Sequence, residues 1–134
     1  MIYHINPVTM KATATPEQIE AALESRRDQG RSNPAIKSCI VGRDHGGDYT
    51  YSAVFVVENR DGHFAYLTHP TTSQTDRLGL NLVERLEIFD VSDDDDPDLN
   101  AKIQKLHRRR NELNPRIAGM LAAVPTYIGS GVDA

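Results

Sequence analysis

The sequence predicts an α+β fold in which strand-forming and helix-forming segments follow the order βαββαβ. Short runs of β-branched and aromatic residues alternate with segments whose apolar residues recur at helical spacing. Turn-forming residues separate two of the strand-like runs, as in a hairpin. The length of 134 residues suits one domain with a modest core.

The first strand is expected over residues 2–10, with a break or bulge at Pro7 because proline lacks a backbone donor. A helix should begin after Thr15, whose hydroxyl and the Gln18 side chain can cap its first turn reciprocally. Gly30 is placed to end this helix in a left-handed conformation.

A hairpin is expected next, with strands over residues 36–43 and 49–58. The second of these strands is apolar on both faces, which predicts a position inside the sheet. Cys39 is the one cysteine of the chain, and its apolar neighbours predict a packing role in the core rather than catalysis.

A second helical region over residues 63–82 should be divided at Pro70, because proline clashes with the preceding helical turn. Asn59 or Asp61 can cap its beginning. A closing strand is expected over residues 86–91. This order of elements is the arrangement called ferredoxin-like.

The ferredoxin-like domain is expected to span residues 1–92. A run of aspartates predicts a solvated acidic linker at 93–98, because like charges repel one another. Apolar residues at helical spacing predict a helical C-terminal extension over 99–134, restarted at Pro115 and packed on its own or a partner's surface. His107 lies among basic residues there and is expected to be exposed to solvent.

Charge and hydropathy exclude two classes of partner. The net charge is −4, and the basic residues of the extension offer too small a surface for nucleic-acid binding. The longest apolar stretch, residues 117–124, has 8 residues against the roughly 20 that cross a bilayer. No secretory signal is visible at the start, so we expect a cytoplasmic protein without membrane association.

Four segments occur in an order and spacing that resemble a known family. They are residues 1–5, residues 15–23, the Tyr-x-x-His-Pro stretch at 66–70 and the strand at 86–90. Together they resemble the stress-responsive dimeric α/β barrel (Dabb) family over residues 1–92. The resemblance implies a homodimer in which two sheets join as a dimeric α/β barrel. A sheet covered by helices on one face also needs a partner for its other apolar face.

The resemblance implies that the barrel cavity holds a small apolar or aromatic ligand. Some members are cofactor-free polyketide cyclases, whose motif places the chemistry on a tyrosine and a later histidine. Tyr66 matches the tyrosine and His69 the motif's first histidine, whereas Thr72 stands where the later histidine would be. A threonine hydroxyl is no general base near neutral pH. The candidate catalytic residues are therefore Tyr66, His69 and His4, with His4, Thr72 or Asp76 as the partner base.

Each candidate also has a purely structural interpretation. His4 would then be a buried histidine that is satisfied by backbone or by a neighbouring subunit. Tyr66 would pack in the core, and His69 would cap the turn before Pro70.

Neither a metal ion nor an organic cofactor is expected. Asp61, His63, His69 and Asp76 lie close together in the sequence, but no pair of them has the spacing of metal ligands.

Two classes of function remain. The first is a homodimeric stress-response A/B barrel protein that binds a small organic ligand, with cofactor-independent cyclase or isomerase activity as the candidate reaction. The alternative is a non-catalytic, stress-associated assembly protein whose barrel is filled by side chains. A roomy, largely apolar cavity with a few polar groups would separate the first from the second.

Overall fold

A five-stranded sheet carries the fold, with its strands in the order β2-β3-β1-β4-β5. The computed structural model describes residues 1–131. The strands are β1 (Ile2–Met10), β2 (Ser38–Arg43), β3 (Tyr51–Val57), β4 (Val83–Ser92) and β5 (Thr126–Gly129). The helices are α1 (Pro16–Ser32), α2 (Arg60–Thr68), α3 (Pro70–Gly79), the short η1 (Leu80–Leu82), α4 (Leu99–Leu113) and α5 (Pro115–Ala122).

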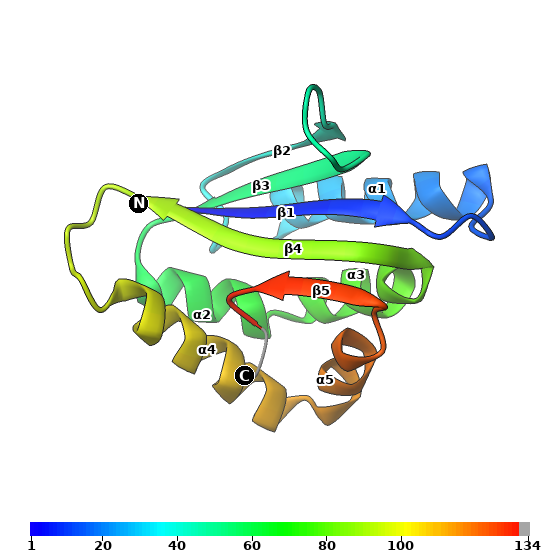
Figure 1. Ribbon diagram of the computed structural model, residues 1–134. Helices are drawn as coiled ribbons and strands as arrows, with labels where there is room; N and C mark the ends of the chain where they lie inside the picture. The colour runs from blue at the N-terminus through cyan, green and yellow to red at the C-terminus, as the bar shows by residue number, and fades with distance from the viewer. Residues whose placement is uncertain (132–134) are drawn as a thin grey trace.

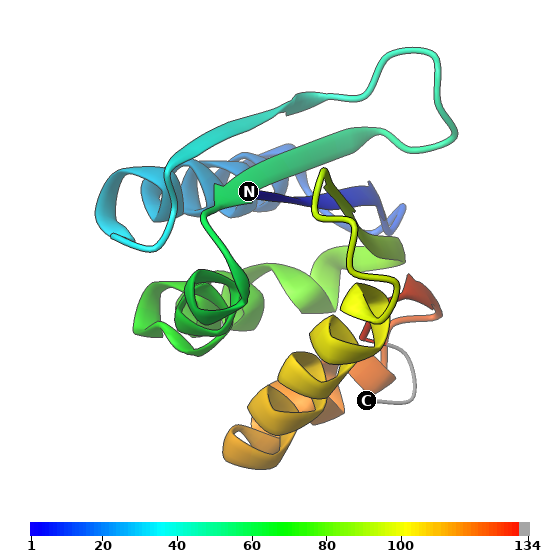
Figure 2. The same cartoon turned by 90° about the vertical axis from the view of Figure 1, so that its left-hand side faces the viewer.

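The elements from β1 to β4 confirm the ferredoxin-like βαββαβ arrangement. β1 lies in the middle and pairs antiparallel with β3 and β4, and β2 forms a hairpin with β3 (Figure 1). β5 adds a parallel strand beside β4, in a part of the chain that was expected to be helical. Figure 2 shows the helices gathered on one side of the curved sheet.

The first strand is continuous through Pro7, but its pairing with β4 is interrupted there, as expected, and the register with β4 shifts between Thr9 and Met10. Its register with β3 is continuous from Ile2 to Val8, whereas its register with β4 stops at Ile5 and resumes at Val8. The Thr50 amide donates to the Val8 carbonyl, so the backbone N–H and C=O of Val8 face β3. Because these groups alternate in direction along a strand, the backbone groups of Pro7 face β4. Pro7 therefore lacks its N–H donor only on the β4 side, where the pairing with β4 is interrupted.

The first helix begins as predicted but ends later. Thr15 and Gln18 form the capping box, with N···O distances of 2.9 and 3.2 Å. The helix runs through Gly30 to Ser32, so the expected left-handed end at Gly30 is wrong. A Cβ at Gly30 would collide with Sγ of Cys39, so this glycine allows α1 to approach β2 closely.

The prediction that Cys39 packs in the core is also wrong, because β2 is an edge strand and the Cys39 side chain is exposed.

The division of the second helical region is confirmed: Asn59 accepts a hydrogen bond from the Gly62 amide at the start of α2, and Pro70 opens α3. β4 extends beyond its predicted bounds at both ends.

The extension packs on its own chain, with α4 against α2 and α5 against α3. Ile103 of α4 joins the core cluster around Phe55 and Tyr66, while Ile117 of α5 joins the cluster around Val8. His107 is fully buried, so its expected exposure is wrong. Within residues 1–131, no helix combines the length and apolar character of a bilayer span.

The face of the sheet opposite the helices carries several exposed apolar side chains. The alternation of side chains along each strand turns Tyr3, Phe89 and Val91 away from the helices, and all three are exposed. On the edge strand, Ile40 is exposed as well. No element within residues 1–131 covers this face.

Two glycines near the end of the chain should respond oppositely to alanine. Gly129 has a φ of 120°, and a Cβ there would collide with the Ile88 carbonyl oxygen. We expect Gly129→Ala to lower the free energy of unfolding by about 1–3 kcal/mol or more in urea titrations. Gly119 lies exposed within α5 with open space around it, so Gly119→Ala should raise that free energy by up to about 1 kcal/mol. Equal effects would contradict the backbone geometry of β5.

Candidate functional site

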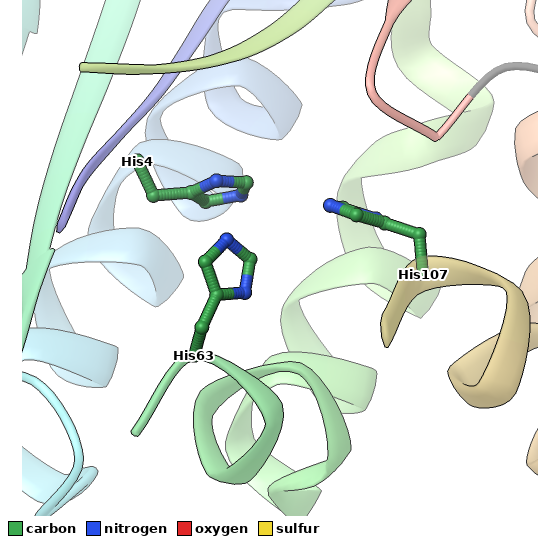
Figure 3. Close-up of side chains that lie close together, drawn as sticks. All are labelled: His4, His63 and His107. Carbon is green, nitrogen blue, oxygen red and sulfur yellow. The ribbon is translucent and has the colours of Figure 1, made fainter. Parts of the chain in front are cut away.

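Three histidines from three different elements meet beneath the sheet. His4 comes from β1, His63 from α2 and His107 from α4, and each is at most 1% exposed. Their ring centroids lie 4.7 Å apart for His4 and His63, 5.6 Å for His63 and His107, and 5.9 Å for His4 and His107. Figure 3 shows the three rings pointing toward one another. We call this set the histidine cluster.

Local structure explains each position. His4 shares the helix-facing side of β1 with Ile2 and Val8, which are also buried. His63 lies in the first turns of α2, close to the Asn59 cap that fixes where the helix begins. His107 lies four residues after Ile103, on the buried face of α4.

Asp90 connects two members of the cluster. It lies opposite His4 in the β1–β4 register, and Nδ1 of His4 donates to its Oδ1 at 2.8 Å. Nε2 of His63 lies 3.2 Å from the same oxygen. Burial alone would raise the pKa of Asp90, but the hydrogen bonds from His4 and His63 hold it well below its ordinary value. Asp90 is thus a buried carboxylate kept ionised by its two partners.

The imidazoles of His4 and His107 favour the neutral state. Burial lowers the pKa of His4, although the hydrogen bond to Asp90 opposes this shift. Burial also lowers the pKa of His107 well below its ordinary value, and His4 and His63 add to the shift. Neutral rings retain a nitrogen lone pair that can accept a hydrogen bond or bind a metal ion.

Several buried polar atoms of this region have no hydrogen-bond partner among residues 1–131. They are both ring nitrogens of His107, Nδ1 of His63, Oδ1 of Asn6 and the hydroxyl of Tyr127. An unsatisfied buried donor or acceptor costs about 1–3 kcal/mol. Such a concentration is typical of a place that receives a ligand, an ion or ordered water.

A small cavity adjoins the cluster. Its volume is about 40 Å³, and its lining includes His4, Asn6, Tyr66 and His107. The Tyr66 ring lies 5.3 Å from the His4 ring, measured between centroids. A space of this size holds a water molecule or a few heavy atoms of a ligand. It lies on the helix-covered side of the sheet within one chain, whereas the family resemblance implied a cavity inside the barrel between two subunits.

Two arginines and one carboxyl group line the same cavity. Arg110 Nη1 lies 3.9 Å from Asp76 Oδ2, and Arg26 donates to the Asn6 carbonyl at 3.2 Å. Partial burial raises the pKa of Asp76 to about 6, although Arg110 and Arg26 oppose the shift. Burial also raises the pKa of Tyr66, so its hydroxyl stays protonated near neutral pH. An adjoining cavity of about 30 Å³ shares Arg26 and Asp76.

The predicted site residues separate into two groups. His4 and Tyr66 come together at the cavity. His69 points elsewhere, because its Nδ1 accepts the Thr71 amide at 3.1 Å and caps α3. Thr72 is buried, donates to the Tyr66 carbonyl at 2.6 Å and accepts from Gln29 Nε2 at 2.7 Å. Its hydroxyl therefore ties α1 to the junction of α2 and α3.

Sequence reasoning missed Asp90 and His107 and gave His63 no role. The signals were present but weak. Asp90 falls at the helix-facing position of β4, two residues after the buried Ile88, and His107 falls at helical spacing from Ile103. The basic residues around His107 masked this spacing.

Comparisons with known proteins identify the family to which the chain belongs. The profile of the "Stress responsive A/B Barrel Domain" (Dabb) family matches residues 2–93. The search of curated proteins finds no match.

Solved structures with a similar fold include a dimeric ferredoxin-like protein of unknown function from Thermobifida fusca (TM-score 0.62, 23% identity, 68% of this chain and 89% of that chain covered). Another is the hydroxynitrile lyase of Passiflora edulis (TM-score 0.63, 13% identity, coverage 71% and 94%). A third is a variant of SnoaB, a cofactor-independent oxygenase of Streptomyces nogalater (TM-score 0.57, 16% identity, coverage 72% and 95%). These similarities establish the fold.

Asp76 should make stability depend on pH. Its pKa of about 6 in the folded chain exceeds the ordinary 3.8, so between pH 4 and 6 the folded state binds more protons than the unfolded state. The contribution of Asp76 to stability therefore falls as pH rises through this window. Urea unfolding of wild type and Asp76→Asn at pH 4.5 and 7.5 measures this effect. From the lower to the higher pH, the free energy of unfolding of wild type should fall by about 1–3 kcal/mol relative to that of Asp76→Asn. A difference between the two proteins that stays constant with pH would refute the shift.

Proposed function

Because this chain belongs to the stress responsive A/B barrel (Dabb) domain family, we propose that it acts as a homodimer whose subunits each bind a small organic ligand at the cavity beside His4 and Tyr66. The observation that carries this proposal is a cavity with several polar side chains on its walls and buried polar atoms left without partners.

The open face of the sheet supports the dimer. Exposed apolar side chains from β1, β2 and β4 share this face, and a second sheet would remove them from water. The Thermobifida fusca protein, which has the same fold, is described as dimeric. A two-fold interface between equivalent sheets is the arrangement that these observations favour.

The lining of the cavity favours a ligand with an oxygen function. The Tyr66 hydroxyl and the guanidinium groups of Arg26 and Arg110 are donors suited to a carbonyl, carboxylate or phenolate oxygen. The volume of about 40 Å³ admits a few heavy atoms, so a larger ligand requires the side chains shared with the adjoining cavity to move. Arg26 and Asp76 are in that shared wall.

Metal-free proton transfer is the second candidate, and the arrangement of Asp90, His4 and Tyr66 supports it. Asp90 orients the His4 ring, and the Tyr66 ring lies 5.3 Å from that ring at the cavity. Such a group can move a proton next to a carbonyl, as a cyclase or isomerase requires. Thr72 already uses its hydroxyl in two buried hydrogen bonds, so His4 and Asp76, which both line the cavity, remain for the role of base. The lyase and the oxygenase cited above show enzymes on this fold.

The open face should determine the oligomeric state. Native mass spectrometry of the wild type should give a dimer, and Val91→Glu should give monomers because it places a charge on the face that the second sheet would bury. Leu113→Glu is the matched control, since both side chains are 55% exposed and Leu113 lies on α4, away from the open face. A monomeric wild type, or a Val91→Glu dimer, would overturn the sheet-to-sheet arrangement.

Ligand binding should depend on Tyr66 and not on His69. We expect small oxygen-bearing probes such as acetate, acetone and benzoate to shift the amide NMR signals of residues around the cavity. Tyr66→Phe removes one donor and should weaken this binding about tenfold, which corresponds to about 1.4 kcal/mol. His69→Ala removes only the α3 cap and should bind as wild type does.

Two results would count against the ligand site. One is the absence of saturable shifts with any probe, which would favour the non-catalytic assembly protein. The other is equal weakening by Tyr66→Phe and His69→Ala, which would indicate a general effect on the fold.

A further inference from the structure

We propose that His4, His63 and His107 together bind one divalent transition-metal ion of the zinc type, with a coordination position left open beside the cavity. The residues are three buried imidazoles, a ligand set that suits zinc, cobalt, nickel or copper rather than calcium or magnesium. This inference goes beyond the proposed function, because ligand binding at Tyr66 does not require it.

The geometry of the cluster is close to that of a metal site. One ring nitrogen from each histidine can be chosen so that all three lie within 4.8 Å of one another. Nitrogens bound to zinc at about 2.0–2.1 Å lie about 3.4 Å apart in a tetrahedral site. Small rotations about the side-chain bonds bring the rings this much closer, and the rings already point toward a common centre (Figure 3).

Asp90 provides the support that metal-bound histidines usually have. Because Nδ1 of His4 donates to the Asp90 carboxylate, Nε2 of this ring keeps its lone pair. A carboxylate behind a histidine orients the ring and makes it a better ligand. The negative charge of Asp90 also offsets part of the charge of a divalent cation in this buried site.

The unsatisfied nitrogens support an ion more than a structural role. Both nitrogens of His107 and Nδ1 of His63 have no hydrogen-bond partner in the described part of the chain. A leucine at position 107 would fill similar space without this penalty. A metal bond would satisfy one nitrogen of each ring and join β1, α2 and α4 at one point.

The third ligand lies outside the part of the chain that the family profile matches. His4 and His63 fall within residues 2–93, whereas His107 is supplied by α4 of the extension. A metal site at this cluster is therefore completed by the extension. With an ion bound, His4 would act as a ligand, so the site competes with the proton-transfer candidate but leaves ligand binding at Tyr66 possible.

Metal titration tests this inference directly. Untagged protein is stripped with a chelator and titrated with Co²⁺, whose visible absorption reports its coordination geometry, and then with Zn²⁺. We expect one Co²⁺ per chain with the intense bands of a four-coordinate site, displacement by Zn²⁺, and a higher midpoint of thermal unfolding with metal. Absence of these bands at excess Co²⁺ would overturn the proposal.

Two substitutions locate the ion. His107→Leu removes a ligand along with two unsatisfied nitrogens, so the metal-free variant should unfold at or above the wild-type temperature while Co²⁺ affinity falls about 100-fold or more. His45→Ala in the hairpin loop is the control and should bind as wild type does. Wild-type affinity in folded His107→Leu, or weakened binding in His45→Ala alone, would contradict the site.

Failure here can be told apart from failure of the proposed function. The amide NMR titration with acetate, acetone and benzoate is repeated on the chelator-stripped wild type and on His107→Leu. If Co²⁺ does not bind while the probes still do, the metal site is refuted and the ligand cavity stands. If Co²⁺ binds and the probes do not, the metal site is supported without the ligand cavity.

Discussion

One buried carboxylate sets the constraints that organise this molecule. Asp90 lies on the helix-facing side of β4, where an ionised group is stable only if donors surround it. His4 satisfies it from the neighbouring strand, and His63 does so from α2. The contact with His63 holds α2 against the sheet, and the two contacts together bring two imidazoles side by side. The remaining side of the cluster is closed by α4, which places His107 against the other two rings.

The parts of the fold that sequence could predict are those that depend on local chemistry. The capping box at Thr15 and the division at Pro70 follow from neighbouring residues alone. Gly30 and Cys39 were misjudged because their roles depend on how closely α1 approaches an edge strand. β5 was missed because a four-residue strand has little signal of its own and is defined by its pairing with β4. His4 and Tyr66 became candidates through two segments that resemble the family, whereas the partners of His4 come from distant segments.

Thr72 illustrates how one fold can serve different chemistry. The position stands in the helical region that resembles the family's cyclase motif, yet here its hydroxyl joins the Tyr66 carbonyl to Gln29 of α1. The chain thus uses this position to hold three helices together. Its titratable groups are gathered instead around His4, one layer closer to the sheet. Similar folds host a lyase and an oxygenase, so reactivity must be argued from the residues present in each chain.

The short strand β5 has a consequence for how copies of this protein can assemble. A sheet that ended at β4 would present a long row of unpaired backbone groups to any neighbouring chain. β5 covers part of that row, and the tight approach of Gly129 to Ile88 closes its far end. Strand-by-strand growth from this side is thereby discouraged. In the homodimer that we propose, the copies meet through the open face of the sheet, where a two-fold pair is complete after one addition and does not propagate into fibres.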